Sequence, residues 1–589
     1  MDSEKLADLL FPEVSESIED VKKKYPDRPA GQLVTRFAPS PTGFLHLGGI
    51  FSALVSWLLA KQQKGVFFLR IEDTDQQRKT EHGVSLIING LKQFGLEAGE
   101  GWVSATEERW AYGPYTQSQR LGLYHVFAKY FVAQWLAYPC WMSEEEIENV
   151  RQWQRLAKQA PGIYGNYALW RERQFSDIEE KISHGESFVI RLKSPGVYGN
   201  KKIFKDIIRW DVFAQEHFVD TVLLKSDGFP TYHFAHLVDD YLMGTTHVVR
   251  AEEWLPSVPL HVQLFELCGL KPPQFAHLAQ LLKTEDGKKR KLSKRKDPEA
   301  DVQWLLAWGF ATQGILEYLM TIISPDYEVW QLAHPQKHFV EHAIILKEMN
   351  KSGALVDIVK MEQVNREYLA RLSDEALYEE ALKWGRERRQ TPNDKRWMLN
   401  AEHWTSNDEM WGEYDMRKFV EILERDNEYM IVAIGIERHG ENDPKRFVKY
   451  VDVYEQVKFF DDEFFSSMAY PALPEGMVED EVRDFLKAYV EVIPDIWGMD
   501  SRIREDDGIG VQEWFGHLRE FWQQFGYAMN NAQFKEWGWK GKTWDLAMLL
   551  RIVLCKAEKT PDLFSVMQVM GRERVRERML WRAEVKVRV

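Results

Sequence analysis

The amino-acid sequence predicts an α/β protein in which a buried parallel sheet carries an inserted domain and is followed by an all-helical region. Three observations support this prediction. Apolar segments at residues 33–37 and 66–71 flank a helical apolar pattern at 50–62, which makes a strand–helix–strand unit. The second segment is almost continuously apolar, as is typical of a strand that helices cover on both faces. After about residue 370, long stretches repeat with the period of a helix.

The remaining elements of the sheet lie further along the chain. Residues 38–43 are rich in proline and glycine, and they form the turn between the first strand and its helix. Two later strands, at 221–224 and 246–250, complete the sheet pattern. Between the two halves, residues 121–219 are mixed and charged, which favours a domain inserted into the sheet.

The chain is long enough for several domains. At 589 residues it exceeds what one hydrophobic core supports, and about three to five domains are expected. Helical periodicity is clearest at 374–388 and 480–489. The pattern divides the chain into a polar N-terminal extension at 1–32, a sheet domain at 33–120 and 220–275, the insert at 121–219, a connecting region at 276–370 and a helical region at 371–589.

Composition is that of a soluble globular protein, with 44% hydrophobic and 28% charged residues. The most apolar long stretch, residues 305–323, contains Gln313 and Glu317, so we expect a helix of a soluble core there rather than a membrane span. The N-terminal segment is rich in Asp and Glu, unlike a signal or transit peptide. We therefore expect a cytoplasmic protein without a membrane segment.

Cysteine usage and charge limit the functions further. Cys140, Cys268 and Cys555 are far apart and form no CxxC pair, so we expect neither a disulfide framework nor a cysteine-ligated metal. The net charge of -15 is a weak argument against a nucleic-acid partner, because binding depends on where the basic residues lie. Within residues 288–296, every position except two is Lys or Arg.

Charged residues stand at the ends of three predicted strands. Arg36, Glu72 and Arg250 lie at or beside these ends, and ligands of such sheets bind at the carboxyl ends of the strands. Two guanidinium groups and one carboxylate would complement an amino acid with an acidic side chain, because Arg pairs with carboxylates and Glu with ammonium groups. Each residue alone is more simply an ordinary strand-end charge. Their joint placement favours a pocket.

Two short motifs predict nucleotide binding. In His46-Leu47-Gly48-Gly49, the glycines allow close approach to the backbone at a helix N-terminus, where phosphate is favoured, and His46 can donate to a phosphate oxygen. Lys291-Leu292-Ser293-Lys294-Arg295 follows a polar segment that contains a glycine, and such a loop can close over a triphosphate. The alternatives are a structural turn for the first motif and a solvated basic loop for the second.

The motifs lie within longer stretches that resemble one family. Their order and domain-sized spacing resemble the two ATP signatures of class I aminoacyl-tRNA synthetases. Residues 36–49 resemble the opening signature of the bacterial type of glutamyl-tRNA synthetase, and Arg70-Ile71-Glu72-Asp73-Thr74-Asp75 resembles a second block of that family. Further similar blocks follow in family order at residues 113–120, 224–235, 238–244 and 250–254. The resemblance weakens after about residue 300, fades beyond about 370 and returns near the C-terminus.

The resemblance implies a fold and an activity. The fold would be a Rossmann-like catalytic domain with an inserted acceptor-end-binding domain, a stem-contact region and a helical anticodon-binding region. The enzyme would form glutamyl-adenylate from L-glutamate and ATP, with Mg²⁺, and transfer the glutamyl group to the 3′ end of tRNA(Glu). We expect it to act as a monomer.

The resemblance also assigns site residues. Catalysis falls to His46 and Lys294. ATP binding falls to His46, Gly48, Gly49, Trp254, Lys291, Ser293, Lys294 and Arg295, and glutamate binding to Arg36, Ala38, Ser40, Glu72, Tyr232 and Arg250. Tyr232 and Ser40 have alternative interpretations as a core aromatic residue and a turn residue.

The sequence departs from the family at one point. Many bacterial relatives hold a cysteine-ligated zinc in the inserted domain. Here Cys140-Trp141-Met142 occupies the place of the first cysteine pair, and residues 164–171 contain no cysteine. We therefore expect no metal site and no zinc.

Three other functions agree less well with the sequence. A glutaminyl-tRNA synthetase is disfavoured by the pair Arg36 and Arg250 and by the block at 70–75. A truncated paralogue that glutamylates a tRNA base lacks the helical region that this chain has. An inactive tRNA-binding relative is disfavoured because His46 and Lys294 are intact. Whether tRNA for glutamine is charged as well stays open.

Overall fold

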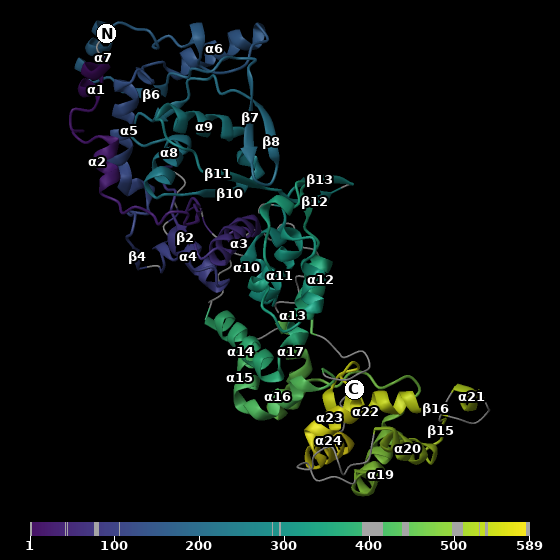
Figure 1. The fold of residues 1–589 in the computed structure, drawn as a ribbon. Helices are drawn as coiled ribbons and strands as arrows, with labels where there is room; N and C mark the ends of the chain where they lie inside the picture. The colour runs from purple at the N-terminus through teal and green to yellow at the C-terminus, as the bar shows by residue number, and fades with distance from the viewer. Residues whose placement is uncertain are drawn as a thin grey trace. The chain divides into compact units, whose positions relative to one another are not determined.

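The described chain forms two compact units. One unit contains Met1–Leu305 and Ile315–Ile358, and the other contains Leu306–Gly314 and Val359–Val589. The computed structural model describes residues 3–41, 43, 45–75, 80, 82–104, 106–285, 287–293, 296–390, 416–438, 447–497, 511–528, 531–535 and 540–584. Figure 1 shows the elements of both units.

The first unit begins its sheet with the predicted strand–helix–strand unit. Strand β1 (Val34–Phe37) leads to helix α3 (Leu47–Gln62) and then to β2 (Val66–Leu69), which is parallel to β1. Strand β3 (Glu100–Trp102) continues the sheet parallel to β2. Most of α3 is buried, which agrees with its apolar sequence. The sheet ends at the antiparallel strand β4 (Glu108–Arg109).

The second half of the sheet lies beside the first. Strands β10 (His247–Ala251) and β11 (Gln274–Leu278) are parallel, and Arg250 lies opposite His277. The amide nitrogen of Thr246, just before β10, donates to the carbonyl oxygen of Val34 at 3.0 Å, so β10 lies against β1. The helices around these strands are α4 (Gly83–Gln93), α8 (Tyr232–Leu242) and α9 (Val258–Leu267).

The region predicted as an insert contributes to two sheets. Strands β5 (Ala137–Cys140) and β6 (Val189–Leu192) pair antiparallel, whereas the hairpin of β7 (Lys201–Asp206) and β8 (Trp210–Gln215) joins the second half of the sheet next to β11. Figure 1 shows this hairpin running away from the ends of β10 and β11. The helices of the region are α5 (Leu121–Ala133), α6 (Glu144–Leu156) and α7 (Phe175–Ser183).

One predicted strand belongs to a different sheet. Strand β9 (Val222–Leu224) pairs antiparallel with β6, so the prediction that residues 221–224 complete the parallel sheet is wrong. Leu223 and Leu224 are buried in a core shared with Ile190 of β6. A short apolar strand suits a central place in either sheet, and its sequence does not indicate which neighbour it pairs with.

The N-terminal segment is folded onto the first unit. Helices α1 (Ser3–Leu10) and α2 (Ile18–Lys23) pack against α5 and bury apolar side chains there. Further along, Arg28 forms a bidentate ion pair with Glu100 of β3, at 2.7 and 2.9 Å, and donates to the carbonyl oxygen of Met243. The segment predicted as an extension is therefore anchored to both halves of the sheet.

A hairpin leads into the second motif that was predicted to bind a nucleotide. Strands β12 (Leu281–Glu285) and β13 (Lys288–Lys291) are antiparallel, and β14 (Ala354–Leu355) pairs with β12. Asp297 accepts two hydrogen bonds of 2.6 Å from Arg290 and one of 2.8 Å from the amide of Ser293, which fixes the end of β13. The helices that follow are α10 (Val302–Ala307), α11 (Thr312–Ile323) and α12 (Tyr327–Ala333). None of the described helices has the length and apolar character needed to cross a membrane.

The second unit is mostly helical, as predicted. The expected helices at 374–388 and 480–489 correspond to α14 (Asp374–Gln390) and α19 (Glu479–Trp497). Helix α19 packs on α24 (Arg572–Glu584). The only strands among the described residues of this unit are the short pair β15 (Tyr527–Ala528) and β16 (Gly541–Lys542). The other helices are α13 (Ile358–Arg371), α15 (Met416–Arg425), α16 (Asn427–Gly435), α17 (Tyr450–Val457), α18 (Asp462–Ser467), α20 (Val511–Gln523), α21 (Asn531–Phe534), α22 (Thr543–Cys555) and α23 (Leu563–Met570).

Candidate active site

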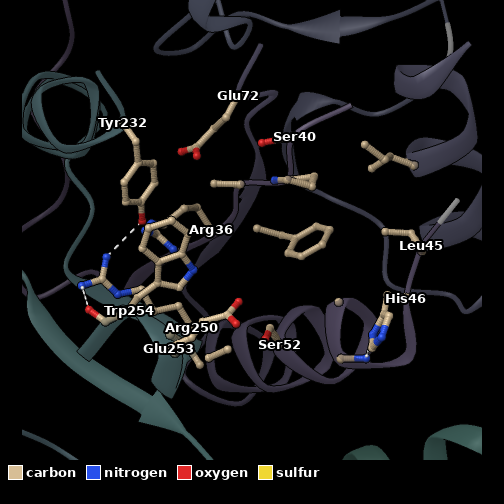
Figure 2. A pocket seen from close by; sticks show the side chains of 18 of the residues that line it. Arg36, Ser40, Leu45, His46, Ser52, Glu72, Tyr232, Arg250, Glu253 and Trp254 are labelled. Atoms are coloured by element: carbon tan, nitrogen blue, oxygen red, sulfur yellow. Dashed lines mark hydrogen bonds between the residues drawn. The ribbon is translucent and has the colours of Figure 1, made fainter. Parts of the chain in front are cut away.

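A cavity of about 1070 Å³ opens where strands β1, β2 and β10 end. The structure brings most of the predicted site residues together around it (Figure 2). Ser293 does not line the cavity, and Lys294 and Arg295 lie outside the described residues. The predicted residues that line it are Arg36, Ala38, Ser40, His46, Gly48, Gly49, Glu72, Tyr232, Arg250, Trp254 and Lys291.

Arg250 is a buried cation at one end of this cavity. Its Nη1 donates to the hydroxyl oxygen of Tyr232 at 3.1 Å, and its Nη2 donates to the carbonyl oxygen of Trp254 at 3.4 Å and to Nδ1 of His261 at 3.2 Å. Its Nε donates to Nε2 of His277 at 3.0 Å. Within the described part of the chain, no carboxylate lies within ion-pair distance of this guanidinium group. Burial lowers the pKa of Arg250 from its ordinary value.

The bonds of Arg250 leave donors for a ligand. A guanidinium group carries two hydrogens on each Nη and one on Nε. Nε and Nη2 have neutral acceptors, and Nη1 uses one hydrogen for Tyr232, so a second hydrogen of Nη1 has no acceptor among the described residues. The hydroxyl of Tyr232 accepts from Arg250 and keeps its own proton, because burial raises its pKa. This end of the cavity therefore offers hydrogen-bond donors to an anion.

A buried ion network forms the neighbouring wall. Asp240 accepts from Nη1 of Arg70 at 2.8 Å and from Nε of Arg36 at 3.3 Å. Nη2 of Arg70 donates to Glu72 at 3.0 Å. Arg36, Arg70 and Asp240 are almost completely buried. Glu72 is thus held by a cation that is itself held by a carboxylate.

The pKa values of the two carboxyl groups diverge. Burial acts to raise the pKa of both. For Asp240 the positive charges of Arg36 and Arg70 outweigh burial, and its pKa lies well below the ordinary value. For Glu72 burial outweighs the attraction of Arg70 and Arg36, and its pKa is raised. Of the two, Glu72 is the carboxylate that would gain more from an additional positive partner.

The cations of the cavity differ in their partners. Arg36 and Arg70 each have a carboxylate within ion-pair distance, whereas Arg250 has none among the described residues. Since an unpaired buried charge is costly, Arg250 favours an anionic group of a ligand.

Asp239 anchors a second buried cluster beneath the site. It accepts from Nε of Arg120 at 2.6 Å, from the amide of Gln117 at 2.8 Å and from the hydroxyl of Tyr124 at 3.0 Å. Nε of Arg70 lies 3.8 Å from the same carboxylate. Asp239 and Asp240 therefore fix helix α8, which begins with Tyr232, to the rest of the sheet domain.

Arg70, Asp239, Asp240 and His277 were not assigned to the site from the sequence. A signal was present in α8, where two adjacent aspartates interrupt an otherwise apolar helix. Such a pair needs buried cationic partners if that face of the helix packs into the core. His277 similarly interrupts the apolar strand β11.

His46 lies on the opposite side of Figure 2 from Arg250, at the N-terminus of α3. Its Nδ1 accepts from the amide nitrogen of Gly48 at 2.8 Å, so a neutral ring carries its proton on Nε2. A Cβ atom on Gly48 would lie 3.1 Å from this Nδ1, which favours glycine there. Negative charge is electrostatically favoured at such a helix N-terminus.

Trp254 and Lys291 border the cavity in different ways. The ring of Trp254 lies against that of Tyr232, with centroids 4.3 Å apart. Lys291 pairs with Glu253, so the end of β13 is tied to the turn that follows β10. In the described part of the chain, no cluster of three or more His, Cys, Asp or Glu side chains could hold a metal ion.

Comparison with known families defines the class of the protein. Residues 32–363 match the family described as "tRNA synthetases class I (E and Q), catalytic domain". The matched range includes every residue that lines the cavity. The cavity therefore lies in the catalytic domain of a class I tRNA synthetase, an ATP-dependent class.

Relatives along the whole chain identify the family within that class. A glutamate–tRNA ligase of Clostridium perfringens (strain 13 / Type A) is 36% identical over 98% of this chain and 100% of its own length. One of Clostridium beijerinckii is 38% identical over 98% of this chain and 99% of its own length. The chain belongs to the glutamate–tRNA ligase family. The predicted family is thereby confirmed.

Solved structures agree with the fold. A glutamate–tRNA synthetase of Elizabethkingia anophelis is similar with a TM-score of 0.66 at 25% identity, over 94% of this chain and 100% of that chain. A glutamate tRNA ligase of Elizabethkingia meningosepticum, solved with its amino acid, has a TM-score of 0.68 at 24% identity, over 94% of this chain and 99% of that chain. The predicted α/β fold with a mostly helical C-terminal part is confirmed.

Proposed function

We propose that this chain activates L-glutamate with ATP and transfers the glutamyl group to the 3′ end of tRNA(Glu). One observation carries the proposal: the buried Arg250 has neutral hydrogen-bond partners but no carboxylate partner among the described residues. The side-chain carboxylate of glutamate would supply the missing partner of this cation. The side-chain amide of glutamine is neutral and would not.

The polar groups of the cavity suggest how glutamate lies in it. Its side-chain carboxylate would accept from Arg250 and Tyr232, near Arg36, and its ammonium group would donate to Glu72 and Ser40. Figure 2 shows Glu72 and Ser40 close together and apart from Arg250, as two ends of one ligand require. Ala38, beside Ser40 on the cavity wall, would contribute through its backbone.

ATP would occupy the part of the cavity near His46. The α-carboxylate of glutamate attacks the α-phosphorus of ATP, the bond to the bridging oxygen breaks, and pyrophosphate leaves. His46 would donate from Nε2 to a phosphate oxygen as negative charge develops, next to the N-terminus of α3. Mg²⁺ would enter with ATP, since this ion is commonly held by phosphates and water with few protein ligands. The other ATP contacts proposed are Gly48, Gly49, Trp254, Lys291, Ser293, Lys294 and Arg295.

The remaining regions have roles that follow from the same proposal. Residues 121–219 would bind the acceptor end of the tRNA, residues 276–370 its stem, and the helical region its anticodon. The enzyme would act as a monomer.

Charging assays test the proposal. Purified protein is incubated with ATP, with either tRNA(Glu) or tRNA(Gln), and with either glutamate or glutamine, and both pyrophosphate exchange and aminoacyl-tRNA are measured. Glutamate should support both reactions and glutamine neither. Charging with glutamine but not with glutamate would favour a glutaminyl-tRNA synthetase. Binding of tRNA without pyrophosphate exchange would favour an inactive relative.

Replacing Lys294 by alanine is expected to lower kcat for adenylate formation by about 10²-fold while changing the KM for glutamate little. The reason is that a loop lysine would act on charge that appears only in the transition state. Exchange kinetics measure both constants. Lys288→Ala in the same basic run is the control and should retain wild-type rates; a raised KM with unchanged kcat in Lys294→Ala would contradict the assignment.

We also propose that the protein holds no structural zinc. Cys140 is buried in a small apolar core of the inserted region, with no second cysteine nearby in the sequence. Metal analysis of purified protein should find no stoichiometric zinc, and a chelator should leave the melting temperature unchanged. One zinc ion per chain would refute this prediction and would point to histidine and carboxylate ligands.

A further inference from the structure

His277 lies directly behind Arg250. The two residues face each other in the register of β10 and β11, and Nε2 of His277 accepts from Nε of Arg250 at 3.0 Å. On the other side of the ring, Nδ1 of His277 donates to Oδ2 of Asp206 at 2.6 Å. His277 is completely buried and Asp206 nearly so. A carboxylate, an imidazole ring and a guanidinium group thus form a line that ends in the cavity.

Asp206 fixes which nitrogen of His277 carries the proton. Oδ1 of Asp206 accepts from the backbone amides of Ile208 at 3.0 Å and Arg209 at 2.9 Å, and Oδ2 also accepts from the amide of His277 at 3.2 Å. Burial acts to raise the pKa of Asp206, but the hydrogen bonds from the His277 side chain and from the amides of Arg209 and His277 outweigh it, and the pKa is lowered. Asp206 is therefore an acceptor only, so Nδ1 of His277 keeps its hydrogen.

The remaining nitrogen of His277 must then be an acceptor. Burial lowers the pKa of His277 and the positive charge of Arg250 acts in the same direction; together they outweigh the hydrogen bond to Asp206, which acts to raise it, so the ring is neutral. A neutral ring with hydrogen on Nδ1 has a lone pair on Nε2. That lone pair faces Nε of Arg250.

We propose that His277, oriented by Asp206, is a positioning residue that sets the preference of the site for an acidic side chain. The proposal rests on the proposed function. Through its bond to Nε, His277 fixes the plane of the Arg250 guanidinium group without neutralising its charge. The charge, the second hydrogen of Nη1 and the hydroxyl of Tyr232 remain available to the side-chain carboxylate of glutamate. A carboxylate in the place of His277 would pair with Arg250 and remove that advantage.

His261 accepts a hydrogen bond from Nη2 of Arg250, as His277 does from Nε. Its Nδ1 lies 3.2 Å from Nη2 of Arg250, and its Nε2 lies 2.9 Å from Nδ1 of His233. Burial lowers the pKa of His261 well below its ordinary value, so this ring is neutral as well. Arg250 is therefore surrounded by neutral acceptors on both sides.

Two substitutions of His277 separate its two bonds. The amide of glutamine reaches approximately the position of Nε2, whereas the amide of asparagine reaches that of Nδ1. His277→Gln therefore keeps an acceptor for Arg250, and His277→Asn keeps only the contact with Asp206. Asp206→Asn removes the group that orients the ring. His247→Asn is the matched control, since His247 lies at the other end of β10, away from the cavity, and bonds the hydroxyl of Thr246.

Aminoacylation of tRNA(Glu) gives kcat and KM for glutamate and KM for ATP, and thermal unfolding shows whether each variant is folded. His277→Asn is expected to raise the KM for glutamate about tenfold or more, with kcat and the KM for ATP changed less than about threefold. Asp206→Asn should shift the KM for glutamate in the same direction. His277→Gln should raise the KM for glutamate much less than His277→Asn does. His247→Asn should match the wild type.

Three results would overturn the inference. One is a KM for glutamate that stays unchanged in His277→Asn. Another is an equal rise in the KM for glutamate in His277→Gln and His277→Asn, which would indicate that the imidazole ring has only a structural role. The third is a fall in kcat and in melting temperature in which the KM for glutamate changes no more than the KM for ATP. If the wild-type protein charges no tRNA with glutamate, the proposed function fails first, which distinguishes the two failures.

Discussion

Arg250→Gln is expected to cost about 3–5 kcal/mol of transition-state stabilisation with glutamate, measured as a fall in kcat/KM; this is the scale of breaking a buried charge pair. Glutamine keeps the approximate size of the side chain but removes the charge and most of its donors. The side-chain carboxylate of bound glutamate would then be buried next to Tyr232 without its main partner. The amide of glutamine loses less, so the preference between the two amino acids should shrink.

The measurement is kcat/KM for glutamate and for glutamine in the wild type and in the variant. Arg109→Gln serves as the control, because Arg109 lies on β4 in an exposed pair with Glu107 and should not change either value. If the two amino acids lose activity by the same factor, Arg250 supports the fold or the nucleotide instead, and the proposed glutamate pocket is wrong.

Asp239→Ala is expected to destabilise the first unit by about 3–5 kcal/mol. The substitution leaves Arg120 buried without its carboxylate and also removes the acceptor of Gln117 and Tyr124. Burial acts to lower the pKa of Arg120, but the charge of Asp239 outweighs it and the pKa is raised, so this carboxylate is what makes the buried cation tolerable.

Calorimetry of thermal unfolding measures the effect as a lowered transition temperature. Asp211→Ala is the comparison, because Asp211 pairs with the exposed Lys205 across the β7–β8 hairpin and such surface pairs contribute about 0–1 kcal/mol. Similar melting temperatures for the two variants would show that the buried cluster is not a major source of stability.

Strand ends explain why much of the site could be predicted from the sequence. Arg36, Glu72 and Arg250 each lie at or just beyond the end of a recognisable apolar strand, and parallel strands end at one edge of a sheet. The glycines and histidine of the first motif were recognisable because a turn leads into a helix there. These are local signals, and the structure brings the residues together around one cavity.

The supporting residues depend on tertiary register, which the sequence does not display. Asp240 meets Arg36 and Arg70 only because α8 packs under strands encoded much earlier in the chain. His277 meets Arg250 because β10 and β11 align at that pair. The incorrect assignment of β9 has the same origin, because an apolar sequence indicates that a strand is buried but not which strand it pairs with.

The position of β7 limits how the enzyme can be divided into modules. Its last residue, Asp206, lies within the predicted insert yet pairs with β11 of the catalytic sheet. Excising residues 121–219 as a cassette would therefore delete the carboxylate behind His277 and leave β11 as an uncovered edge. A minimal catalytic fragment has to retain the β7–β8 hairpin. If the rest of residues 121–219 is exchanged between relatives, the splice therefore has to lie before β7.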